Sequence, residues 1–293
     1  MSEKFDVVII GGGPAGQSAA IYLARGGAKV LVIGKDGGSL ERAEEVANYY
    51  GVYPPVTGAE LIEAGTKQAE SFGAQVISAE VTSIEMSEHF EIITPNNNYT
   101  AKAVLLATGK RRYVPKIAGI KDFIGKGVSF CAVCDGFLYR GKRLALIGSG
   151  DYATHELEEL SRFSKDIIVF TNDKPKSDKF PFEQAIISGK IAQVAGSTRA
   201  QQIVLTDGST YAVDGIFVAE GTAGAADFAR KLGVITEGEN ISVDAQFMTN
   251  IDGLYAAGDC VGGLLQVAKA VSEGAQAAMN ILGFIKKQKK ATN

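Results

Sequence analysis

Side chains that bind metals or form disulfides are scarce in this chain of 293 residues, which has three cysteines and two histidines. A small, odd number of cysteines argues against a fold held together by several disulfides. A structural zinc site takes four ligands from cysteine and histidine, and a four-cysteine iron–sulfur cluster needs one cysteine more than the chain has. Zinc would require Cys260, His89 or His155 to join the other two cysteines. We therefore predict no metal site.

Long apolar runs and an excess of one charge are also missing. The formal net charge is −3, which is not the pattern of a nucleic-acid-binding protein. Residues 1–6 are too polar for a signal peptide, and no apolar run approaches the roughly 20 residues that span a bilayer. The basic residues 286–290 are typical of a solvated end. We expect a cytoplasmic globular protein with no nucleic-acid or membrane partner.

Two of the three cysteines are separated by only two residues, in the sequence Cys-Ala-Val-Cys-Asp-Gly at 131–136. Such thiols can close into a disulfide and reopen, so the pair can accept and pass on two electrons. A pair of this spacing inside a cell is more often redox-active or metal-binding than structural. Thiolate is the reactive form of cysteine, and Asp135 is placed to move protons during exchange. The alternative is two reduced cysteines that only pack, and we expect Cys260 to be a small buried residue.

Glycine-rich turns occur twice, each inside a strand–turn–helix–strand pattern. This pattern is typical of doubly wound folds that bind a dinucleotide at the turn. A single mononucleotide fold with a chance second match is the alternative. The first copy has a strand at 5–10, the turn Gly-Gly-Gly-Pro-Ala-Gly at 11–16, a helix with apolar residues 19, 20, 23 and 24, and a strand at 29–33. The second copy has a strand at 143–147, the turn at 148–150, a helix at 157–163 and a strand at 166–170.

The pattern predicts an α/β fold with two Rossmann-like, three-layer domains, the second inserted into the first. The first domain takes residues 1–112 and 244–293, and the central domain takes residues 113–243 with the cysteine pair. The remaining predicted elements are strands of a small sheet at 74–85, 90–94 and 101–106, strands at 203–209, 215–219 and 254–259, and a helix at 266–285.

Each glycine of the first turn has a separate role. Gly11 permits the tight bend, Gly13 lets the backbone approach a pyrophosphate, and Gly16 lets the helix pack close to the strand. The N-terminus of the helix then faces the phosphate charge. A ribose-binding carboxylate is expected after the second strand, where Asp36 is the nearest candidate and a turn-forming role is the alternative.

Five motifs together resemble the low-molecular-weight thioredoxin reductases, over about residues 5 to 285. They are Gly-Gly-Gly-Pro-Ala-Gly at 11–16, Glu-Val-Ala-Asn-Tyr-Tyr-Gly at 45–51, Ala-Thr-Gly at 107–109, Cys-Ala-Val-Cys-Asp-Gly-Phe at 131–137 and Ala-Ala-Gly-Asp at 256–259. The resemblance implies FAD in the first domain, thioredoxin as partner, a homodimer, and a central domain that rotates. It also implies that Cys134 faces the flavin and Cys131 attacks the partner disulfide. The cofactor-binding residues implied are Gly11, Gly13, Pro14, Ala15, Gly16, Gly34, Lys35, Gly38, Ser39, Leu40, Asn48, Val81, Ala107, Thr108, Gly109, Gly258, Asp259, Gln266, Val267 and Ala268.

The second turn departs from the family pattern. The family has a small hydroxyl residue where this chain has Tyr152, and NADPH users carry a His-Arg-Arg segment where residues 171–176 read Thr-Asn-Asp-Lys-Pro-Lys. A 2′-phosphate needs cationic partners, and Asp173 would repel it. The family's Gly-x-x-Pro-Asn segment is replaced by Gly-Thr-Ala-Gly-Ala at 221–225.

Loss of the NADPH signature resembles the ferredoxin-dependent flavin thioredoxin reductases. We therefore predict an FAD-dependent disulfide reductase that passes electrons from flavin to Cys131 and Cys134 and on to thioredoxin, with reduced ferredoxin as donor. The first alternative is NADH or NADPH as donor, with Asp173 holding the free ribose of NADH. The second, from another class, is a non-catalytic flavin-binding regulator.

Overall fold

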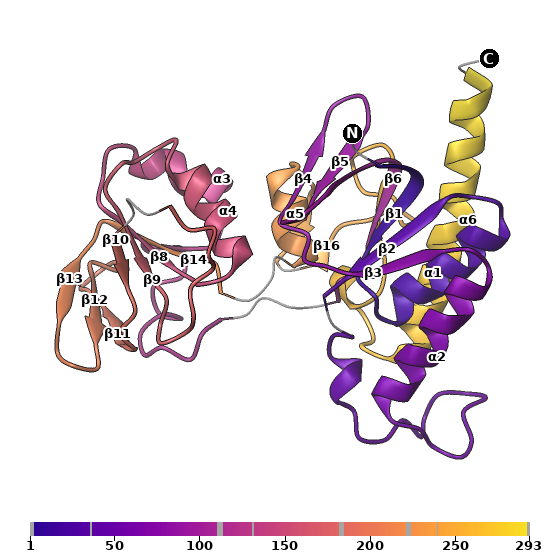
Figure 1. The fold of residues 1–293 in the computed structure, drawn as a ribbon, viewed down its shortest axis with the longest axis horizontal. Coiled ribbons are helices and arrows are strands. Elements are labelled where there is room, and N and C mark those ends of the chain that lie inside the picture. Colours follow the sequence, from indigo (N-terminus) through magenta and orange to yellow (C-terminus); the bar gives the residue numbers. More distant parts are fainter. Residues whose placement is uncertain are drawn as a thin grey trace. The chain divides into compact units, whose positions relative to one another are not determined.

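The structure is a computed structural model that describes residues 3–35, 37–109, 114–130, 132–181, 185–220, 224–238 and 240–291. The chain divides into two compact units, drawn in Figure 1. Met1–Arg111 and Gly224–Asn293 form one of them, here named the outer unit, and Arg112–Ala223 form the inserted unit. The predicted α/β fold, with one domain inserted into another, is confirmed.

The main sheet of the outer unit is largely parallel. Its strands are β1 (Glu3–Ile10), β2 (Val30–Gly34), β3 (Gln75–Ser78), β4 (Ser83–Met86), β5 (Phe90–Ile93), β6 (Asn98–Leu106) and β17 (Leu254–Ala256). The order is β3-β2-β1-β6-β5-β4, and β17 pairs with β6. β3, β2, β1, β6 and β17 run parallel, whereas β4 and β5 are antiparallel. The segment predicted as one stretch at 74–85 is thus two strands, and its first part is the edge of the parallel sheet.

Helices cover the sheet of the outer unit. They are α1 (Pro14–Arg25), α2 (Gly58–Ser71) and α6 (Val267–Ala291), with the short helices η1 (Leu40–Arg42) and η3 (Asp259–Val261). α1 and α6 lie side by side against the sheet (Figure 1). α6 continues to Ala291, beyond the predicted end at residue 285, because lysine and glutamine are good helix formers. None of the helices in the described ranges is both long and apolar enough to cross a membrane.

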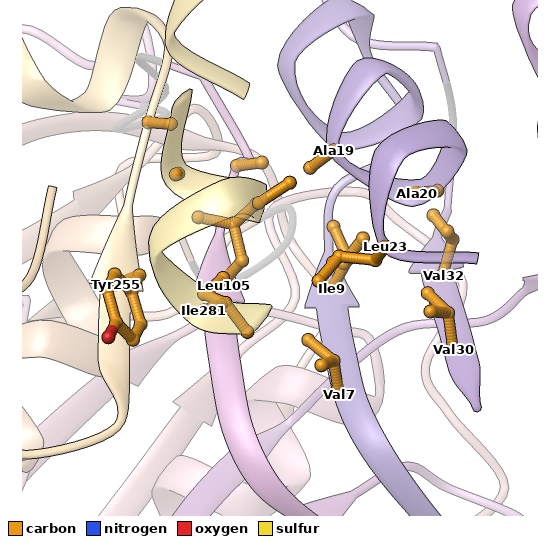
Figure 2. Close-up of a cluster of buried hydrophobic side chains, with 14 of the residues drawn as sticks. Val7, Ile9, Ala19, Ala20, Leu23, Val30, Val32, Leu105, Tyr255 and Ile281 are labelled. Carbon is orange, nitrogen blue, oxygen red and sulfur yellow. The ribbon is translucent and has the colours of Figure 1, made fainter. Parts of the chain in front are cut away.

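The core of the outer unit lies between the sheet and these two helices. β1 is almost wholly apolar from residue 7 onward, as expected for a central parallel strand that is buried on both faces. Gly274 of α6 lets the two helices approach closely, because a Cβ at this position would lie 2.1 Å from the carbonyl oxygen of Ala15 on α1. Figure 2 shows the side chains that meet here, among them Val7, Ile9, Ala19, Ala20, Leu23, Val30, Val32, Leu105, Tyr255 and Ile281.

The inserted unit repeats this plan around a second core. Its elements are β7 (Val128–Ser129), α3 (Ala132–Asp135), η2 (Gly136–Tyr139), β8 (Leu144–Ile147), α4 (Asp151–Leu160), β9 (Ile167–Phe170), β10 (Ala185–Ile187), β11 (Ile191–Ala195), β12 (Gln202–Leu205), β13 (Thr210–Ala212) and β14 (Gly215–Val218). The order β10-β9-β8-β14-β7 makes a parallel sheet, and β11-β12-β13 make an antiparallel one. The β8-α4-β9 segment matches β1-α1-β2, so the predicted internal repeat is confirmed.

Two predicted limits differ from the structure. α4 begins at Asp151 and not at residue 157, because its first turn is buried against the unit and lacks the apolar spacing of an amphipathic helix. The chain was expected to return to the first domain at residue 244, but the outer unit already resumes at Gly224. Three short elements follow that point, namely α5 (Ala225–Lys231), β15 (Thr236–Glu237) and β16 (Asn240–Ile241). α5 contacts β15 and β16, and β16 contacts η3, which ties this segment to the outer unit.

Candidate cofactor and dithiol sites

The first glycine turn lies at the carboxyl ends of β1 and β6. Gly11 has φ +117°, and a Cβ there would lie 2.3 Å from the carbonyl oxygen of Ala107. A Cβ on Gly16 would lie 2.0 Å from the Gly11 carbonyl oxygen. Only glycine fits these two positions, as the predicted roles in the bend and in helix packing require. Gly13 differs, because no described atom lies within 4 Å of its missing Cβ.

The start of α1 is arranged to receive an anion. Gly13 is the N-cap residue with extended backbone, Pro14 follows it, and no side chain caps the helix. The first turn, which the structure describes completely, has no acidic residue. The free backbone N–H groups and the positive end of the helix dipole therefore face the turn without a competing carboxylate. This geometry fits the pyrophosphate of a dinucleotide.

Two other predicted segments meet this turn. A Cβ on Gly258 would lie 2.9 Å from the Ala15 Cβ, so the loop that carries Asp259 touches the first turn of α1. Thr108, next to Ala107, accepts the backbone N–H of Ala225 through Oγ1 at 2.8 Å. The structure thus gathers the glycine turn, the end of β6 and the Asp259 loop at one edge of the sheet, where doubly wound folds bind nucleotides.

The other predicted cofactor-binding residues lie on the segments after β2, β3 and β6 and at the start of α6. Asn48 Nδ2 donates to Gln266 Oε1 at 3.1 Å, which joins the loop after η1 to the start of α6. Val267 and Ala268 form the first turn of α6. Gly34 ends β2, Gly38, Ser39 and Leu40 lie on the turn into η1, and buried Val81 and left-handed Gly109 follow β3 and β6. Asp36 lies outside the described residues.

A carboxylate near the end of β2 comes from a residue that the sequence reasoning missed. Glu80 follows β3, and its Oε2 lies 2.6 Å from Lys35 Nζ, with 9% of the glutamate side chain exposed. The backbone N–H of Ala79 donates to the Gly34 carbonyl at 3.2 Å, which brings the two strand ends together. The sequence pattern places a ribose-binding carboxylate directly after β2, whereas Glu80 comes after β3, the next strand of the sheet, and only the fold brings it to the end of β2.

The dithiol segment lies in the inserted unit on α3. Cys131 lies outside the described residues, and Cys134 belongs to the backbone of α3. Asp135 Oδ2 accepts the hydroxyl of Ser129 at 2.6 Å, which anchors the end of α3 to β7. The backbone N–H of Ala132 donates to Glu156 Oε2 at 3.0 Å, which anchors its start to α4. Glu156 is buried, and the sequence reasoning missed it because only the fold brings α3 and α4 together.

The second glycine turn resembles the first in its close backbone approach, although Gly148 does not have the positive φ of Gly11. A Cβ on Gly148 would lie 2.5 Å from the Ala219 carbonyl oxygen, whereas no described atom lies within 4 Å of the missing Cβ of Gly150. Tyr152, expected to crowd a phosphate here, is buried, with 3% of the residue exposed.

The segment after β9 folds over this second turn. Ser177 donates its backbone N–H to the Ser149 carbonyl at 2.7 Å and its hydroxyl to Asp151 Oδ1 at 2.6 Å. Lys179 Nζ lies 3.7 Å from the other oxygen of Asp151. Asp151 is the first residue of α4, so the chain itself places a carboxylate in the first turn of this helix, near the positive end of the helix dipole.

A second carboxylate follows β14 at the same edge of this sheet. Glu220 is buried, and its Oε2 lies 2.9 Å from Lys174 Nζ. Its Oε1 accepts from Asn172 Nδ2 at 3.2 Å, and Asn172 Oδ1 accepts the backbone N–H of Ile191 at 2.9 Å. Asn172 and Asp173 both have left-handed backbone, with φ of 52° and 62°. The segments at the carboxyl edge of β8, β9 and β14 are therefore joined by internal hydrogen bonds, and this edge carries two carboxylates that are each paired with a lysine.

Cys260 is a buried residue of η3, as predicted. Its Sγ lies 3.3 Å from the Ala257 carbonyl oxygen and 3.4 Å from the Leu106 carbonyl oxygen, and these two acceptors share the single S–H hydrogen. Burial raises the pKa of this thiol from 9.0 to about 12. A thiol held in this form is a poor nucleophile, so Cys260 serves packing.

Comparisons with known proteins agree over nearly the whole chain. The family model described as pyridine nucleotide-disulphide oxidoreductase matches residues 5–274. The chain is 32% identical to the thioredoxin reductase of Aquifex aeolicus, over 98% of this chain and 95% of that protein. It is 34% identical to the thioredoxin reductase of Treponema pallidum, over 97% and 98%.

Two solved structures are also similar. The atypical thioredoxin reductase TRi of Desulfovibrio vulgaris Hildenborough is 39% identical with a TM-score of 0.87, over 98% of this chain and 99% of that chain. A ferredoxin-flavin thioredoxin reductase of Clostridium acetobutylicum is 32% identical with a TM-score of 0.69, over the full length of both chains.

Proposed function

We propose that reduced ferredoxin supplies the electrons for this protein. The chain belongs to the thioredoxin reductases of the pyridine nucleotide-disulphide oxidoreductase family. The family makes the protein a flavin-dependent disulfide reductase with FAD as cofactor and thioredoxin as substrate.

The outer unit is the proposed FAD site. The turn at 11–16 and the start of α1 would hold the pyrophosphate, and Asp259 would bind the ribityl chain or ribose hydroxyls. Bound FAD supplies a centre that can take up single electrons and reduce a disulfide with two. The chain contributes the cradle, the positive helix end and the close approach of the Ala107 and Gly258 segments.

The cysteine pair is the proposed catalytic group. With the pair reduced, Cys131 as thiolate attacks one sulfur of the thioredoxin disulfide, and the other sulfur leaves as a thiolate. Cys134 then attacks the mixed disulfide, so that Cys131 and Cys134 become a disulfide and thioredoxin leaves as a dithiol. Asp135 would deliver the proton that the leaving thiolate takes up. The Ser129 hydroxyl at 2.6 Å holds its carboxylate in place.

One observation carries the choice of ferredoxin: the chain places two carboxylates beside the second glycine turn and hydrogen-bonds the segment after β9 to that turn. Asp151 stands at the start of α4 with Ser177 hydrogen bonded to it, and buried Glu220 stands at the end of β14. These carboxylates neutralise Lys179 and Lys174, the cations near the turn that a phosphate would otherwise attract, and no 2′-phosphate clamp of arginines follows β9. A protein donor does not need this turn. The ferredoxin-flavin enzyme of Clostridium acetobutylicum, which matches the full chain, supports the same choice.

NADH is the second candidate, and it rests on Asp173. This exposed aspartate follows β9, where a carboxylate could bind both hydroxyls of an unphosphorylated ribose. However, its left-handed backbone and the N–H bond to the Ser188 carbonyl at 2.9 Å are also what a turn-forming aspartate shows.

The donor is tested by anaerobic flavin absorbance. The purified holoprotein is mixed in turn with NADPH, NADH and ferredoxin that has been reduced and freed of reductant. We expect ferredoxin to bleach the flavin band within the mixing time and both nucleotides to leave it unchanged over minutes. Rapid bleaching by either nucleotide would overturn the ferredoxin proposal and, for NADH, favour Asp173 as the ribose ligand.

The catalytic assignment is tested separately with Cys134→Ser. The variant should still be bleached by reduced ferredoxin, yet it should lose reduction of thioredoxin. Cys260→Ser is the matched control, because Cys260 is buried away from exchange chemistry and its loss should leave turnover unchanged. Unchanged thioredoxin reduction by Cys134→Ser would overturn the catalytic assignment and favour another flavin reaction, whereas a parent chain that binds FAD but reduces no thioredoxin would favour the regulator alternative.

The resemblance also supports a homodimer in the cytoplasm, where a cysteine pair that must reopen meets a reducing environment. Light scattering on the protein as it elutes from a size-exclusion column should give a molar mass of about twice the chain mass of 30.8 kDa. A mass equal to one chain at micromolar concentration would contradict the dimer.

A further inference from the structure

A half-buried lysine contacts the loop that carries Asp259. Lys269 is in the first turn of α6, and 16% of its side chain is exposed. Its Nζ donates to the carbonyl oxygens of Gly258 at 2.8 Å and Gly262 at 2.5 Å, and lies 3.0 Å from Glu273 Oε2. An ammonium group has three N–H donors, so each of them has an oxygen partner.

Glu273 completes the arrangement one helical turn later. Its Oε2 accepts the backbone N–H of Gly258 at 2.8 Å, in addition to its ion pair with Lys269. The pair therefore holds the peptide groups on both sides of Asp259. Gly258 and Gly262 are left-handed, with φ of 86° and 82°, and this backbone turns both carbonyls toward the lysine. We call Lys269, Glu273 and these two glycines the lysine clamp.

The lysine clamp is an unusual place for a cation. Positive charge in the first turn opposes the helix dipole, and burial of an ammonium group is unfavourable unless oxygen atoms surround it. Here two carbonyls and one carboxylate provide that surrounding, much as ligands surround a metal ion. A simple packing role would be filled at least as well by an apolar side chain.

We propose that Lys269 is a positioning residue for FAD. As an internal cation it fixes the loop 258–262, so that the Asp259 carboxylate is held in the orientation that meets the cofactor before FAD arrives. The proposal rests on the proposed contact between Asp259 and FAD. It also explains the close contact between Gly258 and Ala15, because a loop fixed there supports the first turn of α1, where the pyrophosphate would bind.

The test measures FAD binding to the apoprotein, and so it is independent of any electron donor. FAD is removed, and the recovery of binding is followed by quenching of FAD fluorescence for the parent chain, Lys269→Met, Lys269→Arg and Lys287→Met. We expect Lys269→Met to raise the Kd for FAD by roughly tenfold or more, since three polar partners lose the ammonium. Lys269→Arg should recover part of the affinity. Lys287→Met, which removes an exposed lysine from the same helix, should stay within about twofold of the parent chain, as expected of an exposed substitution.

Amide hydrogen exchange on the apoproteins separates positioning from general stability. The N–H groups of Val261 and Gly262 close the loop by bonding to the carbonyls of Gly258 and Asp259. Their exchange should become faster in Lys269→Met, whereas amides of the central strand β1 should be unaffected. Equal FAD affinity in Lys269→Met and the parent chain, or a loss of affinity with equally faster exchange in β1, would overturn the proposal.

Glu273→Gln keeps the test decisive if Lys269→Met does not fold. The glutamine can still accept the Gly258 N–H, but the ammonium loses its anionic partner. We expect weaker FAD binding than in the parent chain and faster loop exchange. FAD affinity and loop exchange that both equal those of the parent chain would overturn the proposal as well. A protein that binds FAD normally but rejects ferredoxin would instead count only against the proposed function.

Discussion

Cys260 shows how the environment of a single residue decides its chemistry. The side chain lies next to Asp259 in a protein whose reaction depends on thiols, yet it is enclosed by the carbonyls of Ala257 and Leu106. Burial raises its pKa from 9.0 to about 12, so the thiolate fraction at pH 8 falls by about a thousandfold.

We therefore expect Cys260 to resist alkylation by iodoacetamide at pH 8 in the native protein and to react in denaturant. Peptide mass spectrometry of the two samples measures this. The raised pKa also favours the folded state below pH 9, and that contribution is lost as the pH rises from about 9 to 12. Native alkylation of Cys260 at the rate of a free thiol would contradict the burial argument.

At the scale of an element, the glycines of the first turn separate packing from binding. Gly16→Ala would place a Cβ 2.0 Å from the Gly11 carbonyl oxygen, so the turn and α1 must move apart. We expect the free energy of unfolding of the apoprotein to fall by about 1–3 kcal/mol. Gly13→Ala meets no described atom and keeps an allowed φ of −78°, so its apoprotein should stay within about 0.5 kcal/mol of the parent.

The two variants should nevertheless share weak FAD binding, for different reasons. The Cβ of Gly13→Ala would occupy the space that the pyrophosphate is proposed to approach, whereas Gly16→Ala distorts the helix end. Denaturant unfolding of the apoproteins and FAD titration measure the two effects. Normal FAD affinity in Gly13→Ala would show that the phosphate does not lie against this residue.

The dithiol element α3 is short, and its order depends on side chains from other elements. Glu156 accepts the Ala132 N–H from a buried position on α4. In Glu156→Leu this donor loses that partner, and we expect unfolding to become easier by about 1–3 kcal/mol and thioredoxin reduction to slow. Glu158→Leu changes an exposed glutamate two residues further along the same helix and should alter neither.

Denaturant unfolding and steady-state turnover compare Glu156→Leu with Glu158→Leu. Equal stability and turnover in both would remove Glu156 from the support of α3. A variant that loses turnover while keeping its stability would place Glu156 closer to the exchange reaction than the structure suggests.

Elements and turns with local signals were predictable from the sequence, whereas contacts made by the fold were not. Apolar runs predicted β1, β2, β8 and β9, and the glycine spacing predicted both turns, because these features depend on neighbours in the chain. The bond of Ser177 to Asp151 joins residues 26 positions apart, and Lys269 reads in sequence as an ordinary solvated helix residue. Its three oxygen partners exist only once the loop 258–262 is closed.

At the scale of the whole molecule, the chain has two compact units with separate apolar cores. One core centres on β1 with α1 and α6, and the other joins the two sheets of the inserted unit. The outer unit is assembled from both ends of the chain, so it is complete only after residues beyond 224 are present. Folding of the proposed FAD site thus depends on contacts of long sequence separation, such as β17 with β6.

This division predicts how FAD changes thermal unfolding. A ligand that binds only the folded outer unit stabilises that unit alone, by about 2.7 kcal/mol at a concentration one hundred times its Kd. Differential scanning calorimetry of the apoprotein should show two transitions, and added FAD should move one of them upward while the other stays in place. NADPH at the same concentration should move neither, because Asp151 and Glu220 neutralise the lysines near the second turn and no arginine clamp for a 2′-phosphate follows β9. A NADPH-dependent shift of the transition that FAD leaves unmoved would show that the inserted unit still binds a nucleotide, and the ferredoxin route would then lose its structural basis.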